Sequence, residues 1–464
     1  MLFLDSNDPV PLYKQLYMQI RENILSGKWP ADFKLPSVRA LAHEISTSRN
    51  TVEGAYQELH AEGYVYSKQR CGYFVASLDL DQTPFSSQHK KSDNEPFFEV
   101  APTYTYDFHP ARLDPASFPT KIWRKLFIES LRENSRQFSQ YSDPQGDMRL
   151  RISLQEYLER SRGVVCETDQ IVLTSGLQQS LDIVATLLKK KHSVIAFENP
   201  GYPPARFVFR NHSYETISIP VGPKGIELNP LKASQSTIVY VTPSHQLPLG
   251  YVMPVANRLK LIDWAETGDR FILEDDYDSE LRYSGKPIPS LQGLRPDGNI
   301  FYMGTFSKIL SPALRMSYLV LPQSQMETYR HLYQDFFPSV SMLEQLTLTK
   351  FLEQGHWERQ IRRMRTIYKK KHDAILQAIE RYFGTRAMVV GQGAGLHVVL
   401  QLPENSCGET QIIERARQIK IRLIPFSWTC DAGSLESTKL MLGFGEMTIS
   451  EIELGIRALH GVCF

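Results

Sequence analysis

Between residues 171 and 321 the chain alternates short, nearly continuous apolar runs with stretches of helical periodicity. Apolar runs of this kind predict strands buried on both faces, and such strands belong to parallel sheets covered by helices. The predicted strands are 171–174, 194–197, 237–241, 270–274, 300–303 and 316–321. Residues 177–190 and 255–267 predict two of the intervening helices. This region is therefore predicted to be an α/β domain built on a parallel sheet.

The whole chain has 464 residues, which is too long for a single core. Residues 1–76 combine short helical patterns with a β-like end, and 77–105 mix Ser, Pro, Asp, Gln and Lys without apolar periodicity, as linkers do. Residues 106–464 then form a large α/β part to about 335 and a smaller α+β part, which includes a long helix at 356–383. We predict three segments: an N-terminal domain, a linker and a large C-terminal domain.

Charge and cysteine usage exclude several classes of protein. The net charge of +1 gives no overall attraction to nucleic acid, so DNA binding would have to rest on locally placed charges. The five cysteines are scattered without a CxxC pair, which argues against a disulfide framework and against a zinc site or other metal. The sequence has no signal-peptide pattern and no apolar run of membrane-spanning length, so we expect a cytoplasmic protein without a membrane partner.

The N-terminal 76 residues predict a helix-turn-helix followed by a two-stranded wing. A first helix begins near Pro11, a second follows Ser37 as its N-cap, and a third covers 49–62 and ends at Gly63. Two short apolar strands, 64–66 and 73–75, flank a basic turn. In helix-turn-helix proteins, the first turn of the second helix of the pair meets base edges and phosphates.

The candidate DNA contacts lie on the elements that would face a duplex. They are Arg39, Ser48, Arg49 and Thr51 on the helix pair, and Arg70 and Gly72 at the wing tip, beside Lys68. The alternative is a small helical interaction domain with solvated arginines, because residues 1–76 contain equal numbers of basic and acidic residues. Helix-turn-helix spacing alone leaves both interpretations open.

In the α/β region, chemically versatile residues follow the predicted strands. In an open parallel sheet, ligands bind outside the carboxyl ends of the strands, so five such loops could form one pocket. The loop residues concerned are Ser175, Gly176 and Leu177, then Tyr202, then His245, then Asp275 and Tyr277, and finally Thr305, Ser307 and Lys308. The turn at Gly176 opens a helix, whose free N–H groups could hold an anion.

The sharpest pattern is Gly304-Thr305-Phe306-Ser307-Lys308 with Arg315 seven residues later. Two hydroxyls and a guanidinium suit a phosphate, and a desolvated lysine can form a Schiff base. Asp275 ends a buried strand, where a protonated pyridine nitrogen would pair its carboxylate. Tyr277 could hydrogen-bond a phenolate oxygen of the same ligand, and Tyr202 could stack on its ring. Taken singly, Lys308 is an ordinary surface lysine and Asp275 an ordinary strand-end carboxylate.

Two sets of segments carry a family resemblance. LPSVRALA, STSRNTVEGAYQELHAEGYV and RCGYFV resemble the GntR-type winged helix. TSGLQQSLDI, FENPGYPPAR, VTPSHQLPLGYVMP, ILEDDYDSELRY and YMGTFSKILSPALRMSYLV resemble the fold-type I aminotransferase-like domain of MocR regulators. The order of segments is that of the family, which fuses the two domains.

The resemblance implies a pyridoxal 5'-phosphate site. Lys308 would form the internal aldimine, Asp275 would face the pyridine nitrogen and Tyr277 the phenolate oxygen. Further cofactor contacts would come from Gly176, Leu177, Thr305, Ser307 and Arg315 at the phosphate, from Tyr202, and from His245 near the ring. Tyr141, in QYSDPQGDMRLR, corresponds to a tyrosine that fold-type I homodimers lend to the neighbouring subunit's phosphate.

One departure from the family bears on function. Aminotransferases of this fold grip the substrate carboxylate with an arginine in a segment like 439–444, where this chain has Lys439 and no arginine. A lysine does not reproduce that bidentate contact, so Arg112 and Arg206, in loops that could border the pocket, are candidate substitutes.

We therefore expect a regulator rather than an enzyme. Pyridoxal phosphate, or its aldimine with a small amine or amino acid, would control binding to a double-stranded DNA operator. The alternative is an active aminotransferase with an accessory DNA-binding domain. The sequence selects neither the effector nor the regulated genes, and it does not distinguish activation from repression.

Overall fold

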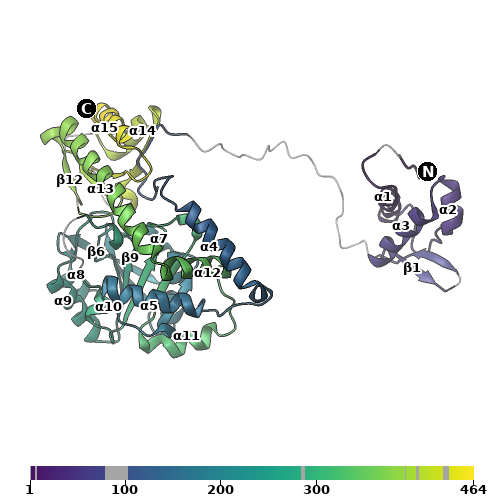
Figure 1. Ribbon diagram of the computed structural model, residues 1–464, viewed down its shortest axis with the longest axis horizontal. Helices are drawn as coiled ribbons and strands as arrows, with labels where there is room; N and C mark the ends of the chain where they lie inside the picture. The colour runs from purple at the N-terminus through teal and green to yellow at the C-terminus, as the bar shows by residue number, and fades with distance from the viewer. Residues whose placement is uncertain are drawn as a thin grey trace. The chain divides into compact units, whose positions relative to one another are not determined.

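The computed structural model describes residues 2–5, 8–69, 71–78, 103–283, 288–391, 393–403, 407–431 and 438–464. The chain divides into two compact units, Met1–Ala101 and Pro102–Phe464. Figure 1 shows both units. Most of the predicted linker, 77–105, lies outside the described residues.

The N-terminal unit contains three helices and a β-hairpin: α1 (Leu12–Leu25), α2 (Val38–Glu44), α3 (Arg49–Ala61), β1 (Val65–Lys68) and β2 (Gly72–Val75). Ser37 caps α2 by accepting a hydrogen bond from the Ala40 amide, as predicted. The core is one cluster in which Leu16 and Ile20 of α1 pack against Val52 and Tyr56 of α3. The antiparallel pairing of β1 and β2 confirms the predicted wing.

The large unit is built on an eight-stranded sheet of order β4-β11-β10-β9-β8-β5-β6-β7. Its strands are β4 (Ile171–Thr174), β5 (Val194–Asn199), β6 (Glu215–Gly222), β7 (Gly225–Ile226), β8 (Ile238–Val241), β9 (Phe271–Asp276), β10 (Ile300–Thr305) and β11 (Ser317–Val320). All six predicted strands are present. The central pairs β6–β5, β5–β8, β8–β9 and β9–β10 are parallel.

The sheet is mainly parallel, as predicted, and it departs from parallel pairing at β11, which runs antiparallel to both β10 and β4, and at β7, which runs antiparallel to β6. A parallel neighbour would require a crossover of a dozen or more residues, usually through a helix. The connection 306–316 contains only the 3₁₀ turn Pro312–Leu314, so the chain returns beside β10 in the opposite direction. This return holds the segment with Lys308 at the edge of the sheet.

Helices cover both faces of the sheet. Side chains of β8 alternate between two separate clusters, with Ile238 and Tyr240 in one and Val239 and Val241 in the other. The first cluster contains residues of α6 (Leu177–Leu188), α7 (Pro203–Asn211) and α11 (Met326–Tyr333). The second contains residues of α8 (Leu228–Ala233), α9 (Val255–Glu266) and α10 (Leu291–Leu294). The two predicted helices correspond to α6 and α9.

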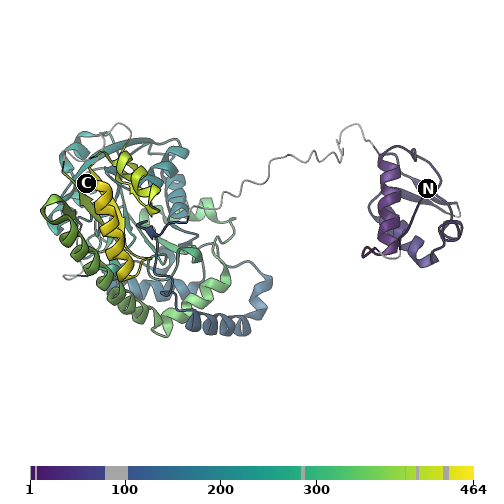
Figure 2. The same ribbon diagram turned by 90° about the horizontal axis from the view of Figure 1, so that it is seen from above.

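The C-terminal part adds a four-stranded antiparallel sheet, β12 (Met388–Val390), β13 (His397–Gln401), β16 (Lys439–Gly443) and β15 (Ile424–Pro425). The predicted long helix is α13 (His356–Phe383), and α15 (Ile449–Cys463) lies beside it (Figure 2). The other elements are α4 (Thr120–Glu133), α5 (Met148–Arg162), α12 (Met342–Glu353), α14 (Glu409–Gln418), β3 (Tyr106–Asp107) and β14 (Ile421–Arg422). Among the described helices, none is both long and apolar enough to cross a membrane.

Candidate functional site

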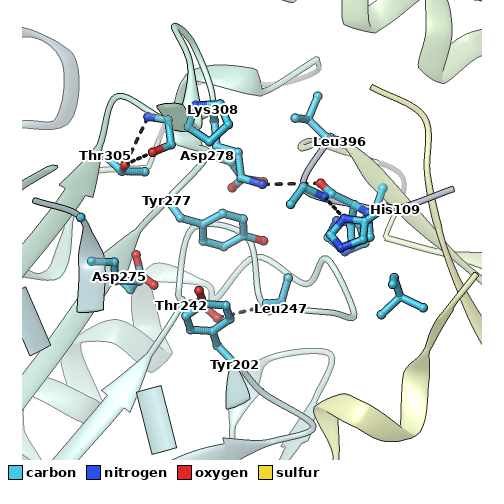
Figure 3. A pocket seen from close by; sticks show the side chains of 18 of the residues that line it. His109, Tyr202, Thr242, Leu247, Asp275, Tyr277, Asp278, Thr305, Lys308 and Leu396 are labelled. Carbon is cyan, nitrogen blue, oxygen red and sulfur yellow. Dashed lines mark hydrogen bonds between the residues drawn. The ribbon is translucent and has the colours of Figure 1, made fainter. Parts of the chain in front are cut away.

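A cavity of about 630 Å³ lies at the carboxyl edge of the large sheet. Its walls come from the loops after β4, β5, β8, β9 and β10, and from the C-terminal part. The volume is typical of pockets that enclose a small organic ligand. In the view of Figure 3, Asp275 and Thr305 lie on one side of this cavity, and His109 and Leu396 lie on the other. The predicted convergence of five loops is therefore present.

Lys308 lines this cavity and is half-buried. Desolvation lowers the pKa of its amine, and this effect outweighs the attraction of Asp278 and Asp275, which raises the pKa. The Nζ atom lies 3.5 Å from the carbonyl oxygen of Pro110, at the limit of a hydrogen bond. Lys308 is thus closer to a neutral, nucleophilic amine than a surface lysine is.

Asp275 lies near the end of β9 and is buried, with its side chain at the cavity. Burial raises the pKa of this carboxyl to about 7, against the opposing effect of the Tyr240 hydroxyl, which donates a hydrogen bond to it. A buried carboxylate without a cationic partner is costly. A positively charged ring nitrogen in the cavity would supply that partner.

Gly176 and Arg315 fit together closely. Gly176 has φ of +118°, and a Cβ atom there would lie 2.2 Å from Nη2 of Arg315. Arg315 is itself in the left-handed conformation (φ 49°), and its Nη2 donates a 3.0 Å hydrogen bond to the carbonyl of Ser175. Because α6 begins at Leu177, its first N–H groups and the guanidinium lie at the same end of the cavity.

Hydroxyl groups complete that end of the cavity. Thr305 Oγ1 donates to Ser307 Oγ at 2.9 Å and accepts from Ser317 Oγ at 2.9 Å. The Ser307 amide also donates to Thr305 Oγ1, at 3.2 Å. Because Ser307 Oγ accepts the hydrogen bond from Thr305, the hydroxyl proton of Ser307 remains available for donation to a ligand. Guanidinium, helix N–H groups and hydroxyl together suit a phosphate.

The two predicted tyrosines line the cavity, whereas His245 lies behind them. Burial raises the pKa of Tyr202 to about 12 and that of Tyr277 well above its usual value, so both remain phenols. The Tyr277 hydroxyl lies 3.0 Å from Nδ1 of His245, and that nitrogen lies 2.8 Å from Oδ2 of Asp278. His245 is buried and is absent from the cavity wall, so it would act on a ligand only through Tyr277 or Asp278.

Four other predicted or related residues lie away from the cavity. Tyr141 is 78% exposed, with its ring 4.3 Å from that of Phe337. The prediction of a loop at Arg206 is wrong, because this residue belongs to α7, where its Nη2 donates to the backbone carbonyl of Glu198. Arg112 does lie in a loop, where its Nε is 3.4 Å from Asp107 and 3.6 Å from Glu446. Lys439 lies over the Phe426 ring.

The sequence did not identify the residues that close the cavity from the side of the C-terminal part. They are His109, Pro110, Leu396, His397, Ile424, Pro425, Trp428 and Met441. Asp278 was also missed, although the run Asp275-Asp276-Tyr277-Asp278 was a usable signal. Apart from His109 and His397, the others are apolar residues on short strands and connections, which the sequence does not distinguish from ordinary core.

The N-terminal unit presents its predicted contact residues at the first turns of α2 and α3. Ser48 caps α3 by accepting from the Thr51 amide at 3.1 Å, and its hydroxyl lies 2.8 Å from that of Thr51. Arg39 and Arg49 are exposed. Gly72 opens β2 with φ of +102°. Arg70 lies outside the described residues.

Comparisons with known proteins agree with both units. The family "Bacterial regulatory proteins, gntR family" matches residues 12–75, and "Aminotransferase class I and II" matches residues 112–433. The chain is 37% identical to the uncharacterized HTH-type transcriptional regulator YdeL of Bacillus subtilis, over 98% of each chain. It is 32% identical to the probable rhizopine catabolism regulatory protein MocR of Rhizobium meliloti, over 90% of this chain and 87% of that protein.

A solved structure is similar to the large unit. It is LysN, the alpha-aminoadipate aminotransferase of Thermus thermophilus, complexed with N-(5'-phosphopyridoxyl)-L-leucine. The TM-score is 0.68 at 25% identity, over 77% of this chain and 91% of that chain. The chain therefore belongs to the MocR-type family of HTH-type transcriptional regulators, in which a gntR-family domain precedes an aminotransferase class I and II domain.

Proposed function

We propose that this protein is a DNA-binding transcription regulator whose affinity for its operator depends on pyridoxal 5'-phosphate held at Lys308. The observation that carries the proposal is the convergence of Lys308, Asp275 and Arg315 on one cavity, in a chain that also has a winged helix. The phosphopyridoxyl group bound by the similar aminotransferase LysN supports the choice of cofactor.

The residues of the cavity fit this cofactor. Arg315, Ser307 and the N-terminus of α6 would hold the phosphate, with Thr305 orienting the Ser307 hydroxyl. The carboxylate of Asp275 would pair with the ring nitrogen, which relieves the cost of its burial. When bound, pyridoxal phosphate supplies an aldehyde that condenses reversibly with amines.

The remaining residues position the ligand and control one proton. Desolvation lowers the pKa of the Lys308 amine, which would favour the neutral, nucleophilic form toward the cofactor. The Tyr277 hydroxyl would donate a hydrogen bond to an oxygen on the cofactor ring, and the His245–Asp278 pair fixes the position of that hydroxyl. Tyr202 lies along the cavity wall, where its ring can stack on a planar ligand.

DNA binding is assigned to the N-terminal unit. Within the described residues, the exposed side chains of Arg39 and Arg49 have no hydrogen-bond or ion-pair partner. Both would be free to contact phosphates or base edges, with Ser48 and Thr51 at the first turn of α3. The predicted wing contacts, Arg70 and Gly72, would reach the adjacent DNA backbone.

We also propose a homodimer. The rings of Tyr141 and Phe337 lie 4.3 Å apart at a tilted angle, and these side chains are 78% and 67% exposed, so they form an apolar surface pair that a second copy would cover. In such a homodimer, the Tyr141 hydroxyl would be donated to the partner subunit's cofactor phosphate, as the family resemblance implies.

The alternative function is an active aminotransferase, favoured by the family match over residues 112–433 and by the nucleophilic lysine. Against it, Arg112 and Arg206 do not line the cavity, so neither replaces the carboxylate-binding arginine. The two functions separate by turnover. An amino donor and a keto-acid acceptor should give less than one product per site for a regulator and many for an enzyme.

The cofactor assignment has a direct test in Lys308→Ala. The purified wild-type protein, incubated with pyridoxal phosphate, should show visible absorption that borohydride removes, and the label should remain attached after denaturation. The variant should keep its fold by circular dichroism and lose the covalent label. A Lys189→Ala control removes a lysine in contact with Tyr214, away from the cavity, and should behave as wild type. A labelled Lys308→Ala protein would overturn the assignment.

A further inference from the structure

The part of the cavity that faces away from the phosphate end is apolar. We call it the outer wall, and its members are Pro110, Leu396, Ile424, Pro425, Trp428 and Met441. Trp428 is 44% exposed while lining the cavity, so part of its indole is available to a ligand. Figure 3 shows Leu396 and His109 on this side, across the cavity from Asp275 and Thr305.

Among the described residues that line the cavity, no lysine or arginine belongs to the outer wall. The two cationic side chains that line the cavity are Lys308 and Arg315, which the proposed cofactor uses. Two arginines outside the cavity lining, Arg112 and Arg422, lie near enough to His109 to lower its pKa. Asp107 engages both of them, with 3.4 Å from its Oδ2 to Nε of Arg112 and 3.4 Å to Nη1 of Arg422.

The two histidines of the cavity do not replace an arginine. Nε2 of His397 lies 2.9 Å from the Pro248 carbonyl, which can only accept, so this nitrogen carries the proton. Burial lowers the pKa of His397 to about 4, so the ring is neutral and its Nδ1 is an acceptor. His109 accepts a hydrogen bond from the Ala111 amide through Nδ1, and burial lowers its pKa as well.

A carboxylate also lies on the cavity wall. Asp278 is buried, lines the cavity, and contacts the Nδ1 atom of His245 at 2.8 Å. A ligand carboxylate entering beside Asp278 would meet like charge, a neutral acceptor at His397 and an apolar wall. Burial of an anion without a cationic partner is strongly unfavourable.

From these contacts we infer that the effector sensed at this site is a primary amine with an apolar or aromatic body and no carboxylate. Its amino group lies toward Lys308, and its body lies on the outer wall. This inference rests on the proposed function, because the amino group is directed at the cofactor held by Lys308. It goes beyond that function by excluding amino acids as the preferred ligands.

The experiment compares matched ligands on the full-length protein loaded with pyridoxal phosphate. The pairs are 2-phenylethylamine with L-phenylalanine, and isoamylamine with L-leucine, which differ only by a carboxylate. Affinity is read by calorimetry and by the change in operator affinity. Each amine should bind at least about tenfold more tightly than its amino acid, a preference of about 1.4 kcal/mol or more. Equal or tighter binding of the amino acids, or no binding of either amine, overturns the inference.

Two variants test the cause of that preference. Ile424→Arg places a guanidinium on the half-buried strand β15, and Trp428→Arg does so at a more exposed position in case the first variant misfolds. Either should raise the affinity for the amino acid relative to its amine by about tenfold, as expected for a charge-assisted pair. Ile424→Gln and Trp428→Gln are the uncharged controls. An unchanged preference in the folded arginine variants counts against the inference.

Cofactor uptake and ligand preference are measured separately on the same protein. A protein that takes up no cofactor, with no visible absorption, contradicts the proposed function itself. A protein that takes up cofactor and then prefers amino acids contradicts only the inference about the effector.

Discussion

At the scale of single residues, the cavity holds a basic group whose pKa is lowered and an acidic group whose pKa is raised. Burial lowers the pKa of the Lys308 amine and raises the pKa of the Asp275 carboxyl to about 7. In each case desolvation is the largest cause of the shift and outweighs the interactions that favour the charged form. Groups of this kind concentrate at functional sites, where a ligand supplies the missing partner.

Gly176 is the residue whose replacement should damage the phosphate end most selectively. In Gly176→Ala the new Cβ would lie 2.2 Å from Arg315 Nη2, at a φ of +118° that alanine rarely adopts. We expect the affinity of the apoprotein for pyridoxal phosphate to fall by about tenfold or more, as for a lost charge-assisted hydrogen bond. Absorbance titration measures it. Gly461→Ala, where a Cβ meets nothing within 4 Å, is the control and should bind normally.

Asp275 should give the apoprotein a pH-dependent instability. Because its folded pKa is raised, its stabilising contribution is complete below pH 3.8 and is lost as the pH rises to about 7. Asp275→Asn removes the charge, and Tyr240 can still donate to the amide oxygen. The apo variant should therefore exceed the wild type in free energy of unfolding at pH 8, by roughly 4 kcal/mol at most.

Denaturant titrations at pH 5 and pH 8 check this expectation. The advantage of Asp275→Asn should shrink at pH 5, and the same variant should bind pyridoxal phosphate more weakly than the wild type at pH 8. An advantage that does not change with pH would mean that Asp275 is ionised or paired throughout.

The sequence identified the cofactor end of the cavity better than its outer wall. Lys308, Asp275 and Arg315 follow predicted strands, so the topology of a parallel sheet alone brings them together. His397 and Trp428 come from the C-terminal part, and only tertiary packing decides which of its strands faces the cavity. Arg206 was misjudged because the helix α7 begins directly after Tyr202 and turns its guanidinium toward Glu198.

At the scale of elements, the first turn of α3 combines a structural role with a proposed contact role. Ser48 fixes the turn through the Thr51 amide, and Arg49 extends from it into solvent. Arg49→Ala should reduce operator affinity by about 1–3 kcal/mol and lower the salt dependence, without changing thermal stability. Lys28→Ala removes another exposed charge of the same unit and should have a much smaller effect. Equal losses in both variants would indicate nonspecific attraction only.

Ser48→Ala should act differently from Arg49→Ala. Loss of the N-cap should destabilise the N-terminal unit by about 1 kcal/mol, and fraying of the first turn should weaken operator binding as well. Thermal unfolding followed by circular dichroism separates the two variants. A Ser48→Ala protein with unchanged unfolding and unchanged operator affinity would show that the cap serves neither purpose.

The positions of helices and strands were predictable where the apolar periodicity is strong. The direction of a strand was less predictable, because it depends on the length of the connection before it. The long helix α13 and the strands β4, β5, β8, β9 and β10 follow the apolar pattern of the sequence. The direction of β11 does not, since its apolar run is equally suited to a parallel or an antiparallel neighbour. The shortness of 306–316 was the physical signal for an antiparallel return.

At the scale of the whole molecule, the chain joins a winged helix to an aminotransferase-like unit. Regulation requires that ligand binding in the aminotransferase-like unit change the affinity of the winged helix for DNA. Such coupling exists only where the ligand interacts differently with the DNA-competent and DNA-incompetent states. The apolar outer wall gives a second ligand a surface to bind. That ligand would add to the difference in binding between the two states beyond the contribution of the cofactor.

The most direct test of this account is operator affinity measured with and without pyridoxal phosphate, for wild type and Lys308→Ala, on DNA from the protein's own upstream region. We predict that saturating cofactor changes the wild-type dissociation constant by about fivefold or more, within the usual range of coupling energies. Lys308→Ala should bind the same DNA and show no change. An equal response in Lys308→Ala, or no response in a wild-type protein that visibly carries the cofactor, would contradict the account.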